Sequence, residues 1–466
     1  MKNTKHELIS VDQIDKLDLK AIEKIYTENV NPGLVHYYKI LGFNKILIKR
    51  AQGVYYYDQD EEKILDFAGG VGAAALGHNH PRIIKARKKF QEEERHQIGQ
   101  WFYSQYAAAL SKNLATICPG DLDVVLLGNC GSEVIEGALK IVEKYQGPSK
   151  SKCVYASNSF HGRTRGALSL TDSPDLRSTF KMLGNHIKVP FGDADAMEKT
   201  LKENPDIGGV FLEPIQGGAG VIIPPEGYLR KVRELCDQFG VLLVLDEIQC
   251  GLGRPGKLFA FEYEDIIPDI LAIAKPLSGS NSAIAALITR KPVYQKAFSS
   301  PKEWHINSPS TFGGMGEACV TAIETINIIF DENLIENARE MGDYFLGKLN
   351  SLKEKYPKFI KDVRGRGLII GIEFHDISNT LVAPLQRMVS IFNEKLIGSL
   401  AALISAILLC DYKIIINFTG TNRNVVRLHP PYITKKEHID YFINSLDEIL
   451  GTGIGGIVKN FVKLKM

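Results

Sequence analysis

Residues 240–249 read GVLLVLDEIQ, an unbroken run of five apolar residues followed by Asp246 and Glu247. A strand that is buried on both faces reads as a near-continuous apolar run, so this stretch indicates a parallel sheet covered by helices. Ligands of such sheets lie beyond the carboxyl ends of the strands, where Asp246 is placed to meet a cationic ligand nitrogen. A buried carboxylate needs a partner in any case, and capping of the next helix or pairing with an arginine such as Arg254 explains this stretch equally well.

Further apolar runs lie on both sides of this stretch and alternate with residues of helical spacing, notably over 131–145 and 226–239. Alternation of this kind predicts an α/β fold built on a parallel, helix-covered sheet. The runs are DVVLLGN at 123–129, SKCVYASN at 151–158, IGGVFLEPI at 207–215 and PDILAIAK at 268–275.

The remaining sequence predicts two smaller parts around a large α/β domain over 80–335. Residues 1–79 are expected to form an N-terminal helix and a small antiparallel β meander that belong to the small domain. Residues 336–466 mix helical and strand-like patterns and predict a small α+β domain. The helix is expected over 10–30, and the meander strands are KILIK at 45–49, GVYYY at 53–57 and KILDF at 63–67.

Composition excludes several classes of partner. The 466 residues carry 56 Lys and Arg against 54 Asp and Glu, so no overall charge attracts nucleic acid or an anionic membrane. The seven cysteines show no CxxC and no zinc-ligand spacing, which predicts reduced thiols, no metal site and a cytoplasmic location. The apolar stretch Leu396–Cys410 is shorter than the roughly 20 residues of a membrane span, so a buried helix is expected there.

Two other motifs end strands of the same predicted sheet. NCGSE at 129–133 joins a strand to a helix, and the free N–H groups of a helix N-terminus attract phosphate. By itself, however, this motif is more often an ordinary N-cap, made here by Ser132. PDILAIAK ends in Lys275, and a lysine desolvated at a strand end is suited to forming a Schiff base. Its other interpretation is a side chain that reaches solvent.

Taken together, the three motifs supply a phosphate cradle around Gly131 and Ser132, the acid Asp246 and the lysine Lys275. Pyridoxal phosphate offers a phosphate, a pyridine nitrogen and an aldehyde, one group for each of these motifs. The sequence therefore predicts a pyridoxal phosphate site at one edge of the sheet.

The sequence also resembles the class III, ω-amino-acid type aminotransferases of the fold-type I pyridoxal phosphate enzymes, over about residues 30 to 450. The blocks in family order are VNPGL, GHNHP, NCGSE, FHGRTRGALSLT, EPIQGG, LDEIQCGLGRPGKLFAFE, PDILAIAK, STFGG and VRLHPP. This resemblance implies a mainly parallel, seven-stranded type of sheet in the large domain and a smaller α+β domain. The stretches VNPGLVHYYK and EGYLRKVRELCDQFGVLLVLDEIQ are most similar to putrescine and then ornithine aminotransferases.

The resemblance also implies roles for single residues. Lys275 holds the cofactor aldehyde and moves the proton, and Asp246 faces the pyridine nitrogen. Arg427 grips a substrate carboxylate, and Glu213 lies near the cofactor. Thr311 reaches the phosphate from the other subunit, which makes a homodimer with a shared active site. The other implied contacts are Gln249 with the ring hydroxyl, Gly131 and Ser132 with the phosphate, and Phe160 stacked on the ring, with His161 beside it as a weaker candidate.

These implications predict transfer of an amino group from an ω-amine, such as putrescine, ornithine or 4-aminobutyrate, to 2-oxoglutarate or a similar oxo acid. One departure bears on this: Gly218 stands where the family usually has the glutamate that pairs with Arg427. An amino-acid racemase or epimerase on the same fold is therefore an alternative. The intact Lys275, Asp246 and Gln249 argue against a fold kept only for binding.

Three features near the substrate entrance also stand out. The segment 396–422 is apolar and strand-like in AILLCDYKIIINF, and looks longer than the family's usual stretch, so we expect it to reshape the entrance. Tyr38 and Trp304 are candidate lining residues, although ordinary packing explains each of them as well.

Overall fold

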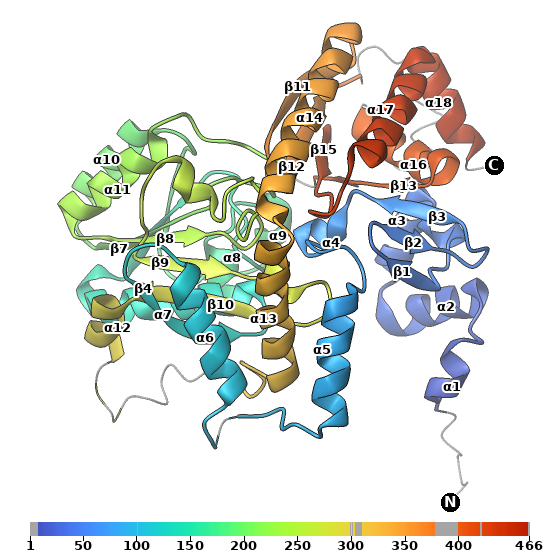
Figure 1. The fold of residues 1–466 in the computed structure, drawn as a ribbon. Helices are drawn as coiled ribbons and strands as arrows, with labels where there is room; N and C mark the ends of the chain where they lie inside the picture. Colours follow the sequence, from blue (N-terminus) through green and yellow to red (C-terminus); the bar gives the residue numbers. More distant parts are fainter. Residues whose placement is uncertain are drawn as a thin grey trace, which may run out of the picture.

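The computed structural model describes residues 8–99, 101–298, 300, 302, 310–377, 399–419 and 422–464. Its largest sheet has seven strands and lies in the left-hand part of the molecule in Figure 1. The strand order is β4 (Leu122–Gly128), β10 (Ala285–Arg290), β9 (Ile270–Ile273), β8 (Leu242–Asp246), β7 (Ile207–Leu212), β5 (Lys152–Ala156) and β6 (Ile187–Val189).

Five neighbouring strands of this sheet, from β9 to β6, run parallel, as the apolar runs predict. Strand β10 is antiparallel to both of its neighbours, β4 and β9. This strand was not expected from the sequence. It follows β9 through the short 3-10 helix η5 (Lys275–Ser278), and an antiparallel neighbour needs no crossover helix.

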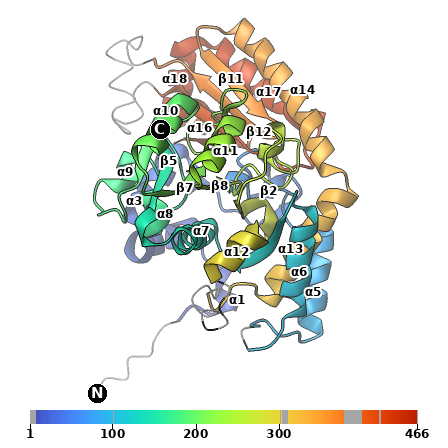
Figure 2. The same cartoon turned by 90° about the vertical axis from the view of Figure 1, so that its left-hand side faces the viewer.

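Side chains of alternate residues on β8 belong to two different cores. Leu243 and Leu245 pack with α10 (Ala194–Glu203) and α11 (Tyr228–Phe239), whereas Leu242 and Val244 pack with α7 (Gly131–Gln146). Figure 2 shows α10 and α11 on one side of the sheet and α7 with α12 (Lys291–Phe298) on the other. Because side chains alternate between the faces of a strand, Asp246 lies on the side of α7.

The N-terminal meander forms, but it begins at residue 50 and not at residue 45. Strands β1 (Arg50–Gln52), β2 (Tyr55–Tyr57) and β3 (Lys63–Asp66) pair antiparallel, but the expected strand KILIK at 45–49 is wrong. The expected helix over 10–30 is divided into α1 (Val11–Ile14), α2 (Leu19–Ile25) and the π-helical turn η1 (Tyr26–Val30). The division follows from Asp18, whose side chain accepts the backbone N–H of Ala21 and starts a new helix.

A second small sheet has the order β11 (Ile360–Arg366), β12 (Ile369–Phe374), β15 (Val425–Leu428) and β14 (Asn417–Phe418). The helices that accompany it are α13 (Gly316–Asp331), α14 (Leu334–Lys355), α16 (Leu400–Tyr412), α17 (Lys436–Gly451) and α18 (Gly453–Lys463). The buried helix expected within 396–410 is α16, so the strand-like interpretation of AILLC is wrong. Within the described ranges, no helix is both long and apolar enough to cross a membrane.

An N-terminal strand and a C-terminal strand pair in one sheet. Strand β13 (Ile414–Ile415) pairs parallel with β3, and Figure 1 shows the N-terminal strands beside the C-terminal segment. The apolar core of this region joins residues of both ends, such as Leu65 and Ile414. This pairing supports the proposed grouping of residues 1–79 with the small C-terminal domain.

Candidate active site

A cavity of about 690 Å³ lies where β8 and β9 end and α7 begins. Almost every residue proposed from the sequence lines it. These residues are Gly131, Ser132, Phe160, His161, Glu213, Asp246, Gln249, Lys275 and Arg427, together with Gly218. The predicted convergence of three strand-end motifs is therefore present in the structure.

The N-terminus of α7 forms one wall of this cavity. A Cβ atom on Gly131 would lie 2.9 Å from Cδ1 of Ile248, so glycine lets the helix approach the end of β8. The N-cap residue is Cys130, whose side chain makes no capping bond, and Ser132 lies inside the helix. The interpretation of Ser132 as an ordinary N-cap is therefore wrong, and the first N–H groups of α7 stay available to an anion.

Asp246 is held from two sides at the end of β8. Its Oδ1 accepts the N–H of Ile248 at 3.0 Å, and its Oδ2 lies 2.8 Å from Nδ1 of His161. The alternative pairing with Arg254 is wrong, because that guanidinium donates instead to the carbonyl oxygens of Leu368 and Pro430. Asp246 thus remains as a fixed carboxylate in the cavity.

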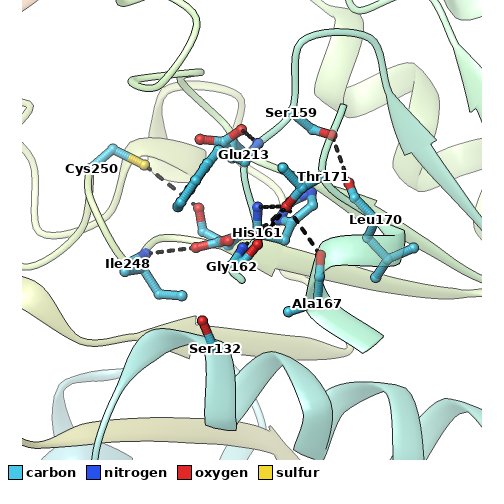
Figure 3. Close-up of polar contacts among 12 residues, drawn as sticks. Ser132, Ser159, His161, Gly162, Ala167, Leu170, Thr171, Glu213, Ile248 and Cys250 are labelled. Carbon is cyan, nitrogen blue, oxygen red and sulfur yellow. Dashed lines mark hydrogen bonds and ion pairs between the residues drawn. The ribbon is translucent and has the colours of Figure 1, made fainter. Parts of the chain in front are cut away.

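His161 connects Asp246 to the neighbouring loop, and Figure 3 shows the polar contacts around it. Its backbone N–H donates to Oγ1 of Thr171 at 2.9 Å, which fixes the loop. Burial disfavours the charged ring, but the hydrogen bond and charge of Asp246 outweigh it and raise the pKa of His161. The Nε2 atom is buried without a hydrogen-bond partner in the described part of the chain. A proton on this atom has no acceptor among the described residues, which agrees with a ligand beside it.

Lys275 lies two residues beyond the end of β9, at the start of η5, and its ammonium group forms no hydrogen bond with a described residue. Burial lowers the pKa of Lys275, although the charges of Asp246 and Glu213 oppose that shift. A lowered pKa increases the fraction of neutral amine, which is the nucleophilic form. The alternative, in which this lysine merely reaches solvent, does not agree with its position in the cavity.

Glu213 is a buried carboxyl group that follows β7. Its Oε1 accepts the backbone N–H of Phe160 at 2.9 Å and so positions the residue before His161. Burial raises the pKa of Glu213 to about 7, with a further contribution from the charge of Asp246. This carboxyl group therefore changes protonation near neutral pH. The positive charge of Lys275 opposes the rise of its pKa.

Arg427 reaches the cavity from β15. Burial lowers the pKa of Arg427 to about 10. Its Nη1 donates to the carbonyl oxygen of Gly217 at 3.3 Å, while Nε is buried without a partner. Among the described residues, no carboxylate oxygen lies within ion-pair distance of this guanidinium. A cation that is largely desolvated and lacks a counter-charge is suited to binding a carboxylate.

Gly217 and Gly218 leave room for the side chains of Gln249 and Phe160 in the site. A Cβ atom on Gly218 would lie 3.0 Å from Cβ of Phe160, so a larger residue there would press on the aromatic side chain. Gln249 packs against Gly217, and its Nε2 donates to the carbonyl oxygen of Val71 at 3.1 Å. Val71 has a φ of 58°, a conformation that a β-branched residue rarely adopts.

Sequence reasoning missed several residues that line the cavity. Arg163 lies two residues after His161, within the block FHGRTRGALSLT, so that block offered a signal for it. Val71 and Asn417 carried no such signal, because the backbone turn of Val71 and the pairing of β14 with β15 place them there.

Two of the predicted residues lie outside this cavity, and a third cannot be placed. Thr311 is exposed and does not line the cavity of its own chain. Tyr38 lines a different cavity, and Trp304 lies outside the described residues.

The residues of the cavity fit pyridoxal phosphate. The helix N-terminus at Gly131 suits its phosphate, the carboxylate of Asp246 suits its pyridine nitrogen, and Lys275 suits its aldehyde. The buried Nε2 of His161, which lacks a partner, lies beside that carboxylate. The charges and the unoccupied hydrogen-bonding capacity thus agree with the cofactor that the motifs imply.

Known proteins of similar sequence and structure are aminotransferases. Aminotransferase PigE from a Serratia species is 34% identical over 449 residues, which cover 90% of this chain and 52% of the relative. The chain thus spans about half the length of this curated relative. The ornithine aminotransferase of Toxoplasma gondii ME49 is 27% identical, with a TM-score of 0.79 and coverage of 97% of each chain.

Two further structures similar to this chain are also aminotransferases. The ornithine aminotransferase of Plasmodium yoelii is 29% identical, with a TM-score of 0.70, covering 89% of this chain and 94% of that one. An ω-transaminase from Pseudomonas jessenii, in complex with PMP, is 25% identical, with a TM-score of 0.75, covering 88% and 94%. The family model described as Aminotransferase class-III matches residues 41–450. The chain therefore belongs to the class III aminotransferases, which are pyridoxal phosphate enzymes of fold type I.

Proposed function

We propose that this aminotransferase moves an amino group from an ω-amine, such as putrescine, ornithine or 4-aminobutyrate, to 2-oxoglutarate or a similar oxo acid. The observation that carries the proposal is the combination of Lys275 and an unpaired Arg427 in one cavity. A lysine is needed for the amine chemistry, and a desolvated guanidinium selects a carboxylate. The similarity to ornithine aminotransferases and ω-transaminases supports the same assignment.

Five residues hold the cofactor in this proposal. Gly131 and Ser132 bind the phosphate, Phe160 stacks on the ring, Gln249 contacts the ring hydroxyl and Asp246 faces the pyridine nitrogen. When bound, pyridoxal phosphate supplies an electron sink for the carbon that bears the amine. Asp246 keeps the pyridine nitrogen protonated, because His161 and the backbone of Ile248 fix its carboxylate.

Lys275 performs the proton transfer. Its Nζ removes a proton from the substrate carbon that carries the amine, because a lysine of lowered pKa retains a neutral fraction near neutral pH. Arg427 meanwhile binds the carboxylate of the oxo acid with two parallel hydrogen bonds. With glycine at 218, the guanidinium needs no displacement of a glutamate before the oxo acid binds.

The active enzyme is proposed to be a homodimer in the cytoplasm. An exposed Thr311 that does not line its own cavity agrees with a role in the cavity of the other subunit. All seven cysteines are free, as expected of a reducing compartment.

The test follows the absorbance of the bound cofactor in the purified protein. Putrescine, ornithine or 4-aminobutyrate is expected to convert it to the amine form, and 2-oxoglutarate to restore the aldehyde form. Lys275→Ala should abolish turnover, whereas Lys188→Ala at the surface should not. Absence of conversion with every amine would contradict the proposal. Deuterium exchange at Cα without oxo-acid formation would instead identify a racemase, an alternative that the comparisons do not support.

A further inference from the structure

A second cavity, of about 510 Å³, lies between the N-terminal helices, the meander and α16. We call it the tail cavity. Most side chains that line it are apolar, including Leu19 and Ile22 of α2, Phe43, Ile48 and Leu409 of α16. The single charged residue of its lining, Glu23, is neutralised by Lys39, whose Nζ lies 2.6 Å from its Oε1. The tail cavity is therefore suited to hydrocarbon.

A smaller cavity, of about 170 Å³, shares lining residues with each of the other two, and we call it the neck. Phe43, Leu409 and Ile415 line both the neck and the tail cavity. Asn417 lines both the neck and the cavity that contains Lys275. Ile415 and Asn417 are two residues apart, or about 7 Å along an extended strand. Residues of the short segment 415–417 therefore line all three cavities.

The neck opens beside the residue that selects carboxylates. Asn417 pairs with Arg427 across β14 and β15. Tyr37, which also lines the neck, lies near enough for its charge to affect the pKa of Arg427. Asn417 thus lies between the cavity that contains Lys275 and the apolar lining of the neck, next to the strand that carries Arg427.

We propose that the tail cavity and the neck receive the hydrocarbon chain of the amine substrate, so that the ω-amines used by this enzyme include unbranched long-chain primary amines. This inference rests on the proposed function. In the reaction, the C–N bond of R–CH2–NH2 breaks to leave R–CHO, whose oxygen comes from water. The amino group and one hydrogen of the carbon pass to the oxo acid, which becomes the amino acid and loses its keto oxygen as water. The amine is thus oxidised and the oxo acid reduced, so no further oxidant is required.

The physical basis is the transfer of methylene groups out of water. Each buried methylene is expected to raise kcat/KM by about fourfold until the chain fills the cavities. Charged diamines such as putrescine gain nothing from this lining, since a buried ammonium group lacks a counter-charge there. The enzyme should therefore prefer a long monoamine to a diamine of equal length.

The test measures kcat/KM of the holoenzyme for 1-aminoalkanes from butylamine to dodecylamine, with 2-oxoglutarate as acceptor and putrescine as the reference donor. The values are expected to rise with chain length and then level off. Ile48→Lys places an ammonium group in the lining of the tail cavity and should lower the dodecylamine-to-butylamine ratio at least tenfold. Ile84→Lys is the matched control, because the two side chains are 42% and 43% exposed, and Ile84 lines none of the three cavities.

A second variant and a binding measurement complete the test. Ser405→Leu narrows the neck and should also reduce the ratio, while melting curves confirm that the variant is folded. Calorimetry with 1-alkanols, which bind without reacting, should show affinity for the holoenzyme that rises with chain length and falls in Ile48→Lys. Turnover of putrescine with no dependence on chain length would overturn this inference alone. Failure with every amine would overturn the proposed function as well.

Discussion

One buried residue, Glu213, makes the folding stability of the protein depend on pH. Its carboxyl group is buried near Asp246, His161 and Lys275, and burial raises its pKa from the ordinary value of 4.5 to about 7. The folded protein therefore binds a proton more tightly than the unfolded chain does. Stability that depends on this proton is fully present below about pH 4.5 and is lost as the pH rises through about 7.

Glu213→Gln should remove this loss. We expect the free energy of unfolding of the variant, relative to the unchanged protein, to rise by about 2 to 3 kcal/mol between pH 5 and pH 8. Urea unfolding of the cofactor-free protein at the two pH values measures it. The exposed Glu226→Gln serves as the control. A difference that is the same at both pH values would contradict the assignment.

Arg427 is expected to act on only one of the two substrates. Arg427→Met removes the cation but keeps an apolar side chain, so KM for 2-oxoglutarate should rise by about 10- to 100-fold. KM for an amine without a carboxylate, such as putrescine, should change much less. Steady-state kinetics with each substrate varied in turn measures both. Equal effects on both substrates would show that Arg427 supports the fold of the site and not the carboxylate.

At the scale of single elements, the sequence predicted the strands that are buried on both faces. β8 and β9 read as apolar runs because helices cover both of their faces. The pairing of the short strands β13 and β14 could not be predicted from the sequence. Two residues are too few to show an alternating pattern, and the partner of β13 is distant in the sequence. For the same reason the motifs located Asp246 and Lys275, but not Asn417.

Helix α16 shows where pattern alone misleads. All its residues from Leu400 to Leu409 are buried, so it has no polar face and its apolar run resembles a strand. The cap that starts it is the informative feature: Ser399 accepts the N–H of Ala402 at 3.4 Å and donates to the carbonyl oxygen of Arg423 at 2.6 Å.

Ser399→Ala should destabilise the protein through this cap. Loss of a buried N-cap leaves the first N–H groups of α16 and the carbonyl of Arg423 without a partner, at a cost of about 1 to 2 kcal/mol. Urea unfolding measures the change. Asp18→Ala, at the exposed start of α2, removes a side-chain cap from a seven-residue helix and should cost less. A similar cost for both substitutions would show that burial of the cap is unimportant.

At the scale of the whole molecule, the proposed homodimer makes a sharp prediction for mixed subunits. Thr311→Asp would place a negative charge against the phosphate of the other subunit's site, and Lys275→Ala inactivates its own site. When the two inactive variants are refolded together, half of the random dimers contain one intact site, so activity should recover to about a quarter of the unchanged level.

The control for this experiment mixes Lys275→Ala with Asp246→Ala, two substitutions that affect the cavity of the same subunit. Each mixed dimer then has both sites damaged, and no activity should return. Activity that returns in neither mixture would mean that Thr311 serves its own subunit.

The pairing of β3 with β13 has a consequence for folding during synthesis. Strand β3 receives its partner β13 only when residue 414 is available, although β3 itself ends at residue 66. A ribosome must therefore add about 350 residues after β3 before this edge is covered, and meanwhile the nascent meander offers an unpaired strand to other chains. Production of the protein in quantity should benefit from slow translation, low temperature and chaperones that shield exposed strands.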